Sequence, residues 1–145
     1  MNGFANSLAL GSLLLLALAC QTSQMPSGSA ALSNHRWVLT ELDGQPIIDT
    51  VRRNAASLQF FEKEGRVAGS GGCNRITGGY ERSGTDGLKF SRIVSTRMAC
   101  PGPDLETPFL RALDRVDGFS IAQGVLTLRQ GQAVLARLQA TAPGQ

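Results

Sequence analysis

Apolar and polar positions alternate along most of the chain after residue 35, which is the pattern of β-strands that bury one face. In one such segment Ala56, Leu58 and Phe60 share a face at a period of two. Asp-Gly and Gln-Gly pairs, which favour turns, separate many of these segments. The alternation predicts strands at 36–42, 56–61, 66–72, 78–81, 88–93, 119–122, 125–130 and 133–140.

The segment 104–118 departs from this alternation, because its apolar residues recur at intervals of four, four and three, as on an amphipathic helix. Asp104 is one candidate for the cap of this helix, and Thr107 is the other, with Pro108 at the favoured first helical position. Gly118 is expected to end it. The apolar stripe consists of Leu105, Phe109, Leu113 and Val116.

Because strands outnumber helices, we expect a mainly β, β-rich α+β fold: a strongly curved antiparallel sheet or incomplete barrel wrapped around one α-helix. The glycines within 69–79 suit sharp sheet curvature and β-bulges. Without the first twenty residues the chain has about 125 left, enough for one domain, expected at 36–140, and too few for two.

The first twenty residues carry no charged side chain. Their apolar run, from Leu8 to Ala19, is about 12 residues long, too short to cross ~30 Å of hydrocarbon and typical of a signal peptide. We therefore predict a signal peptide at 1–19. The sequence "LALAC" ending at Cys20 resembles a bacterial lipobox, in which the Cys is lipidated. Plain secretion with an incidental Cys and an uncleaved anchor are the alternatives.

Lipidation of Cys20 would hold the protein to a membrane through its N-terminal acyl chains. The residues that follow, within 20–35, are small, polar and mostly uncharged, which favours a flexible tether. Gln21 resembles the default for outer-membrane sorting. The expected location is the cell envelope, anchored by lipid and most simply on the outer membrane facing the periplasm.

The chain has 14 Lys and Arg against 11 Asp and Glu, a net charge of +3. The basic residues are scattered and interleaved with acids, whereas nucleic-acid binders concentrate them on one face, so no nucleic-acid partner is expected.

Three cysteines are present, and with Cys20 lipidated, Cys73 and Cys100 remain as a pair. In an oxidising compartment such a pair favours a disulfide, which would close a loop of about 27 residues and stabilise the fold by about 3 kcal/mol. Free structural thiols, or a redox or metal role, are the alternatives.

Candidate chemistry is sparse. The single histidine, His35, lies just before the first strand and far along the chain from both thiols. These three groups fall short of the four ligands of a zinc site. Lys63 falls in a charged turn and Lys89 on the outward face of a strand, so neither suits a catalytic base. We expect no catalytic residue, no metal and no cofactor.

Asn74, Arg75, Thr96 and Arg97 flank the two cysteines. A disulfide would gather them into a polar patch with two guanidinium groups, able to bind an anionic ligand or partner. The alternative is structural: Asn74 would bond backbone groups in a turn, and Arg97 would pair with a carboxylate such as Glu106.

Several segments together resemble, in order, the META domain of HslJ-like bacterial lipoproteins over nearly all of residues 36–139. They are "WVLTELDGQPI" at 37–47, "GSGGCNRITGGY" at 69–80, "LKFSRIVSTRMAC" at 88–100 and "ETPFLRAL" at 106–113. The resemblance implies a small β-rich domain around one helix, with the two cysteines close in space. It also implies association with heat shock or envelope stress, and no established enzymatic activity.

These observations favour a non-catalytic envelope lipoprotein that acts as a binding or structural module, with an envelope protein or a lipid as its ligand. A lipid carrier or a pilotin-like chaperone is one version, which needs an open pocket under the helix rather than a core filled by the large apolar side chains. The alternative is a secreted interaction protein, such as an enzyme inhibitor that presents the 96–103 loop.

Overall fold

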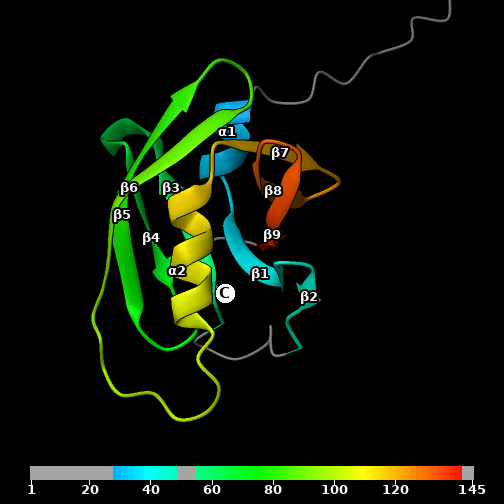
Figure 1. Cartoon of the computed structure of the whole chain (residues 1–145). Helices are drawn as coiled ribbons and strands as arrows, with labels where there is room; N and C mark the ends of the chain where they lie inside the picture. Colours follow the sequence, from blue (N-terminus) through cyan, green and yellow to red (C-terminus); the bar gives the residue numbers. More distant parts are fainter. Residues whose placement is uncertain (1–27, 49–54, 142–145) are drawn as a thin grey trace, which may run out of the picture.

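The computed structural model describes residues 28–48 and 55–141, most of which form one nine-stranded antiparallel sheet (Figure 1). The predicted signal peptide at 1–19 and Cys20 lie outside the described residues. The strands are β1 Arg36–Leu42, β2 Gln45–Pro46, β3 Ser57–Phe61, β4 Arg66–Ser70, β5 Arg75–Ser83, β6 Gly87–Ser95, β7 Gly118–Ala122, β8 Val125–Gln130 and β9 Ala133–Thr141. The helices are α1 Gly28–Ser33 and α2 Glu106–Arg115, with a 3₁₀ turn at Glu62–Glu64.

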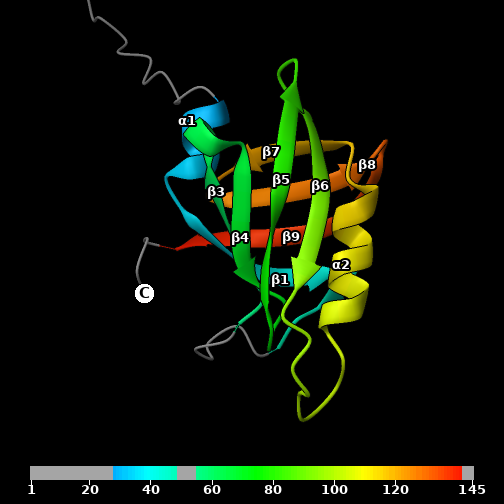
Figure 2. The same cartoon turned by 90° about the vertical axis from the view of Figure 1, so that its left-hand side faces the viewer.

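The sheet curls into a ring. Its strands follow the order β2-β1-β3-β4-β5-β6-β7-β8-β9, and β1 also pairs with β9 along most of its length. The ring stays incomplete between β6 and β7, which share only the pair Gly87–Gly118. Figure 2 shows β4, β5 and β6 running across β7, β8 and β9, with α2 alongside β6. The predicted curved, mainly β fold with one main helix is confirmed.

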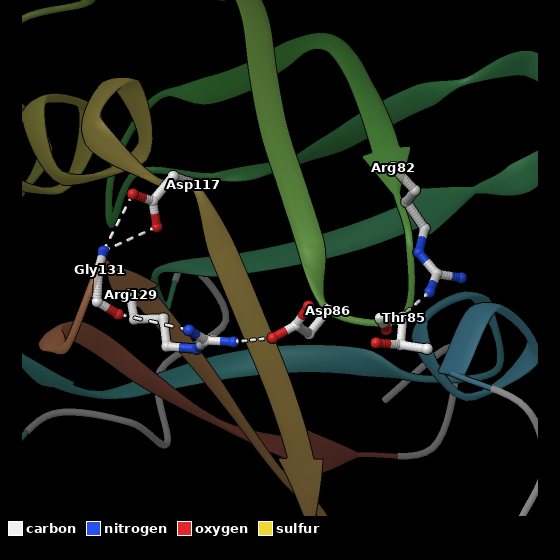
Figure 3. A network of polar contacts seen from close by, with 6 residues as sticks. All are labelled: Arg82, Thr85, Asp86, Asp117, Arg129 and Gly131. Atoms are coloured by element: carbon white, nitrogen blue, oxygen red, sulfur yellow. Dashed lines mark hydrogen bonds and ion pairs between the residues drawn. The ribbon is translucent and has the colours of Figure 1, made fainter.

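Side chains and turn backbone reinforce the narrow β6–β7 junction (Figure 3). Arg129 on β8 forms an ion pair with Asp86 in the turn before β6. Both carboxylate oxygens of Asp117 accept hydrogen bonds from the backbone N–H of Gly131, at 2.9 Å each. The β5–β6 hairpin is thus joined to the β8–β9 hairpin across the seam of the ring.

The interior of the ring is filled by apolar side chains. Trp37, Phe60 and Phe109 are essentially inaccessible to solvent, and Phe90 and Leu105 pack against them from partly buried positions. Close packing of this kind stabilises the fold through burial of apolar surface, at about 25 cal/mol per Å².

Helix α2 buries the face that its spacing predicted, with Phe109, Ala112 and Leu113 in the core. Leu105 occupies the N-cap position of α2 and makes no side-chain capping bond. Asp104, one of the two predicted caps, lies one residue earlier, and its Oδ1 accepts a hydrogen bond from the backbone N–H of Thr107 at 3.0 Å. This bond satisfies one of the N–H groups left unpaired at the start of a helix.

The folded part of the chain begins earlier than its composition indicated. Residues 28–33, which composition assigned to a flexible tether, form α1. Leu32 at the end of this helix is buried in the core, and its carbonyl accepts a hydrogen bond from the Trp37 indole at 2.8 Å. A buried indole N–H needs an acceptor, so the hydrogen bond from Trp37, the second residue of β1, holds the end of the helix.

Candidate functional site

A disulfide joins Cys73, in the loop after β4, to Cys100, in the loop between β6 and α2, as predicted. The two Cα atoms lie 6.1 Å apart. Cys73 is half-buried, whereas Cys100 is exposed. The bond therefore fixes a solvent-facing loop to the end of the sheet, below α2 in Figure 2.

Asn74, next to the disulfide, is buried and uses both ends of its side-chain amide. Its Oδ1 accepts hydrogen bonds from the backbone N–H of Met98 at 2.7 Å and from the Thr96 hydroxyl at 3.0 Å. Its Nδ2 donates to the Met98 carbonyl at 3.2 Å. Asn74 thus satisfies the backbone of a loop that has left the sheet.

Glu106, the first residue of α2, connects the helix to the same network. Its carboxylate accepts from the backbone N–H of Asn74 at 3.2 Å, from Asn74 Nδ2 at 3.3 Å and from the Ser95 hydroxyl. It lies against Gly71, where a Cβ would come within 2.6 Å of Glu106 Cγ. Within the described residues the carboxylate is held by neutral donors, without an ion pair. We call this assembly the disulfide corner: Cys73, Asn74, Ser95, Thr96, Met98, Cys100 and Glu106.

The four residues of the predicted patch divide into two pairs. Asn74 and Thr96 bond to each other inside the disulfide corner. Arg75 and Arg97 are exposed, and neither guanidinium forms an ion pair with a residue in the described ranges. The suggested Arg97–Glu106 pair is wrong, because Asn74 and Ser95 supply the hydrogen bonds to Glu106.

A cleft of about 730 Å³ opens beside the disulfide corner. Its described lining includes Ile48, in the segment after β1, and Met98, in the loop between β6 and α2. Both side chains face solvent, with exposed fractions of 95% for Ile48 and 63% for Met98. The charged groups among its described lining residues are Asp104 and Glu106, both acidic. The volume lies within the range of protein ligand sites.

Asp104 at this cleft is held in its ionised form. Hydrogen bonds from the side chain and backbone of Thr107 lower the pKa of Asp104 below its ordinary value, with a smaller contribution from the Arg111 charge. The cleft therefore keeps a negative charge at its helix side at neutral pH.

The ring of His35, the single histidine of the chain, packs edge-on against the Trp37 ring, with the two centroids 5.4 Å apart. No group of three His, Cys, Asp or Glu side chains in the described ranges is placed to hold a metal ion. The helices described are too short or too polar to cross a membrane.

Sequence reasoning missed the cleft, Ser95 and the backbone of Met98 as parts of the site. The cleft could not be predicted because its lining comes from loops that meet only in the folded chain. The glycine at position 71 was the one feature of the sequence that pointed to the Glu106 contact. A larger residue there would leave no room for the Glu106 side chain.

The sequence of this chain is similar to a known protein family and to a named relative. A family model described as the META domain matches residues 30–142. Heat shock protein HslJ of Escherichia coli strain K12 is 32% identical over 92 residues, which are 63% of this chain and 62% of that protein.

Two structures solved by NMR share the fold. One has a TM-score of 0.57 at 28% identity and covers 76% of this chain and 92% of its own. The other, from Burkholderia xenovorans, has a TM-score of 0.63 at 22% identity and covers 97% of this chain and 99% of its own.

Proposed function

Because the chain belongs to the META domain family, we propose that it is a non-catalytic, stress-associated binding module of the bacterial envelope. The similarity to a protein named for heat shock supports the stress association. The lipobox-like sequence before Cys20 supports a lipid anchor, with the outer membrane facing the periplasm as the location.

The observation that carries the proposal is how the disulfide corner uses its polar groups. Asn74 bonds to both Thr96 and Glu106, so the neutral polar side chains of the corner brace the loop. The loop that they hold exposes Arg97 and Met98 to solvent beside the cleft. Rigidly held, exposed side chains favour recognition, because little conformational freedom is lost when a partner binds.

Surface recognition is favoured over carriage of a lipid inside the sheet. The side chains that would have to make way for an acyl chain, including Trp37, Phe60 and Phe109, fill the core. Opening that space would cost the burial of large aromatic groups, about 3–5 kcal/mol for each.

The anchor is tested by membrane fractionation of the full-length protein and its Cys20→Ser variant, with labelled palmitate. We expect label and membrane association in the wild type, and neither in the variant. The stress association is tested by protein abundance after a temperature upshift. An unlabelled wild type that is released with soluble periplasmic proteins would contradict the anchor, and a flat response to heat would contradict the stress role.

A second candidate is favoured by the loop itself. Residues 98–104 are all exposed, and the loop is fixed at Cys100 by the disulfide and at Met98 by Asn74. An enzyme inhibitor would present such a loop to its target. Replacing Arg97 or Met98 by Ala is then expected to abolish partner binding with unchanged thermal stability, and unchanged binding would exclude this function.

A further inference from the structure

The cleft beside the disulfide corner combines apolar walls with one sign of charge. Ile48 and Met98 both line it, and Leu105 adds a partly buried apolar surface at the start of α2. Asp104 and Glu106 are acidic, and no Lys, Arg or His is among the described residues that line the space. The described lining therefore favours a group that is apolar over most of its surface and positive near the two carboxylates.

Glu106 shows where that positive charge would be favourable. Its carboxylate is half-buried and held by the Asn74 amide groups and the Ser95 hydroxyl, which are neutral donors. Asp104, on the preceding turn, is ionised and also belongs to the cleft lining. An ammonium or guanidinium group entering the cleft would gain from both charges.

The exposed rim favours a protein segment over a small ligand. Ile48 is 95% exposed and Met98 is 63% exposed, so much of their apolar surface faces outward. A small molecule inside the cleft would leave that surface in water, whereas an extended chain laid across it would cover both side chains.

We infer that the cleft is a docking site for an extended, apolar segment of a protein partner that carries a Lys or Arg side chain. This inference rests on the proposed binding function and names the chemistry of the partner. The basic group lies near Asp104 and Glu106, and the apolar neighbours of that group contact Ile48 and Met98.

The probe is a fluorescein-labelled synthetic peptide with one central Lys, flanked by Leu and Val at alternate positions with Ser between them. Two matched peptides replace that Lys by Gln or by Glu. Binding to the full-length lipidated protein in detergent is measured by fluorescence anisotropy at low and at physiological salt. We expect the Lys peptide to bind most tightly, the Glu peptide least, and the difference to shrink as salt screens the charges.

Two substitutions test the lining. Asp104→Asn removes a charge and keeps a residue that caps helices as well as Asp, and we expect binding about two- to fivefold weaker. Ile48→Ser removes an exposed apolar side chain, and we expect binding about tenfold weaker. Each has a control outside the cleft: Asp114→Asn on the exposed side of α2, and Val94→Ser on β6, where Val94 is 59% exposed. Both controls are expected to bind as the wild type does.

Failure to bind the Lys peptide, equal binding of the Glu peptide, or equal effects of the cleft and control substitutions would overturn the inference. Self-association in sedimentation equilibrium that Ile48→Ser abolishes would assign the cleft to a second copy and would overturn it too. If the peptide fails while photo-crosslinking in the envelope captures a partner through another surface, the inference falls and the proposed binding function stands. If neither the peptide binds nor photo-crosslinking captures a partner, the inference and the proposed binding function are both contradicted.

Discussion

The side chain of Asn74 pairs with the backbone of Met98 as one strand residue pairs with another. Oδ1 accepts from the Met98 N–H at 2.7 Å, and Nδ2 donates to the Met98 carbonyl at 3.2 Å. The relationship continues the hydrogen bonding of β5 and β6 past the end of the sheet. It holds the loop that forms one wall of the cleft.

We expect Asn74→Ala to lower the free energy of unfolding by about 2–3 kcal/mol, because it leaves the backbone of Met98 and the Thr96 hydroxyl without their partner. Urea denaturation measures the change. Thr77→Ala is the control, since its exposed hydroxyl donates only to the Val67 carbonyl, and a change within about 0.5 kcal/mol is expected. Equal effects of the two substitutions would show that the amide does not brace the loop.

Removing the disulfide with Cys73→Ser and Cys100→Ser together is expected to lower the free energy of unfolding by about 3 kcal/mol, through the added freedom of the unfolded chain. Dithiothreitol is expected to lower the stability of the wild type and to leave the double variant unchanged. Alkylation followed by intact-mass measurement supplies the direct check. Free reaction of Cys73 and Cys100 in the folded, non-reduced protein would contradict the bond.

Tyr80, the single tyrosine of the chain, is expected to titrate above its ordinary pKa of 10.0. Burial raises the pKa of Tyr80 and the Glu62 carboxylate adds to the effect, while Arg82 opposes it. The unfolded chain releases this proton first as pH rises, so the contribution of Tyr80 to stability is full below pH 10.0 and is lost as pH passes through the folded pKa.

The near-ultraviolet absorbance of tyrosinate follows this one residue in the native protein and in urea. We expect the native midpoint to lie above the midpoint in urea, and Glu62→Gln to reduce the difference. Tyr80→Phe is expected to weaken the loss of stability at alkaline pH. Coincident native and unfolded midpoints would show that the phenol is hydrated in the folded state.

Two glycines are expected to respond differently to alanine. At Gly69 a Cβ would lie 1.9 Å from the Ser57 carbonyl oxygen, a clash with the backbone of the neighbouring strand β3. Gly69→Ala is expected to cost about 3 kcal/mol or more. Gly84 has a φ of +59°, and a Cβ there would meet no atom within 4 Å, so Gly84→Ala is expected to cost only the left-handed strain, about 1–2 kcal/mol. Thermal or urea unfolding of the two variants ranks them, and the reverse order would contradict the register of β3 and β4.

The alternation of apolar residues predicted the strands because each strand has one buried face. In the last hairpin Leu126 lies opposite Leu138 and Leu128 opposite Ala136. A register shift after Leu128 then places Val134 opposite Arg129, and Leu135 turns into the core. A bulge of this kind reverses the faces locally and leaves little trace in the pattern of a single strand.

The disulfide corner was predicted only in part. The pairing of Cys73 with Cys100 followed from the cysteine count, but the roles of Asn74 and Arg97 depended on distances across more than twenty residues of chain. Composition also placed residues 28–33 in a tether, because these residues are small and uncharged. The structure makes them a helix whose Leu32 carbonyl bonds to the buried Trp37 indole, a contact that composition does not reveal.

The most direct test of the account is photo-crosslinking from position 98 of the full-length lipidated protein in its native envelope. A photoreactive phenylalanine analogue is placed there and, as a matched control, at position 94. Met98 and Val94 are similarly exposed, at 63% and 59%, but only Met98 lines the cleft. We predict a discrete crosslinked envelope protein from position 98 that is missing from position 94. The same products from both positions, or none from position 98, would contradict a binding module that works through the disulfide corner.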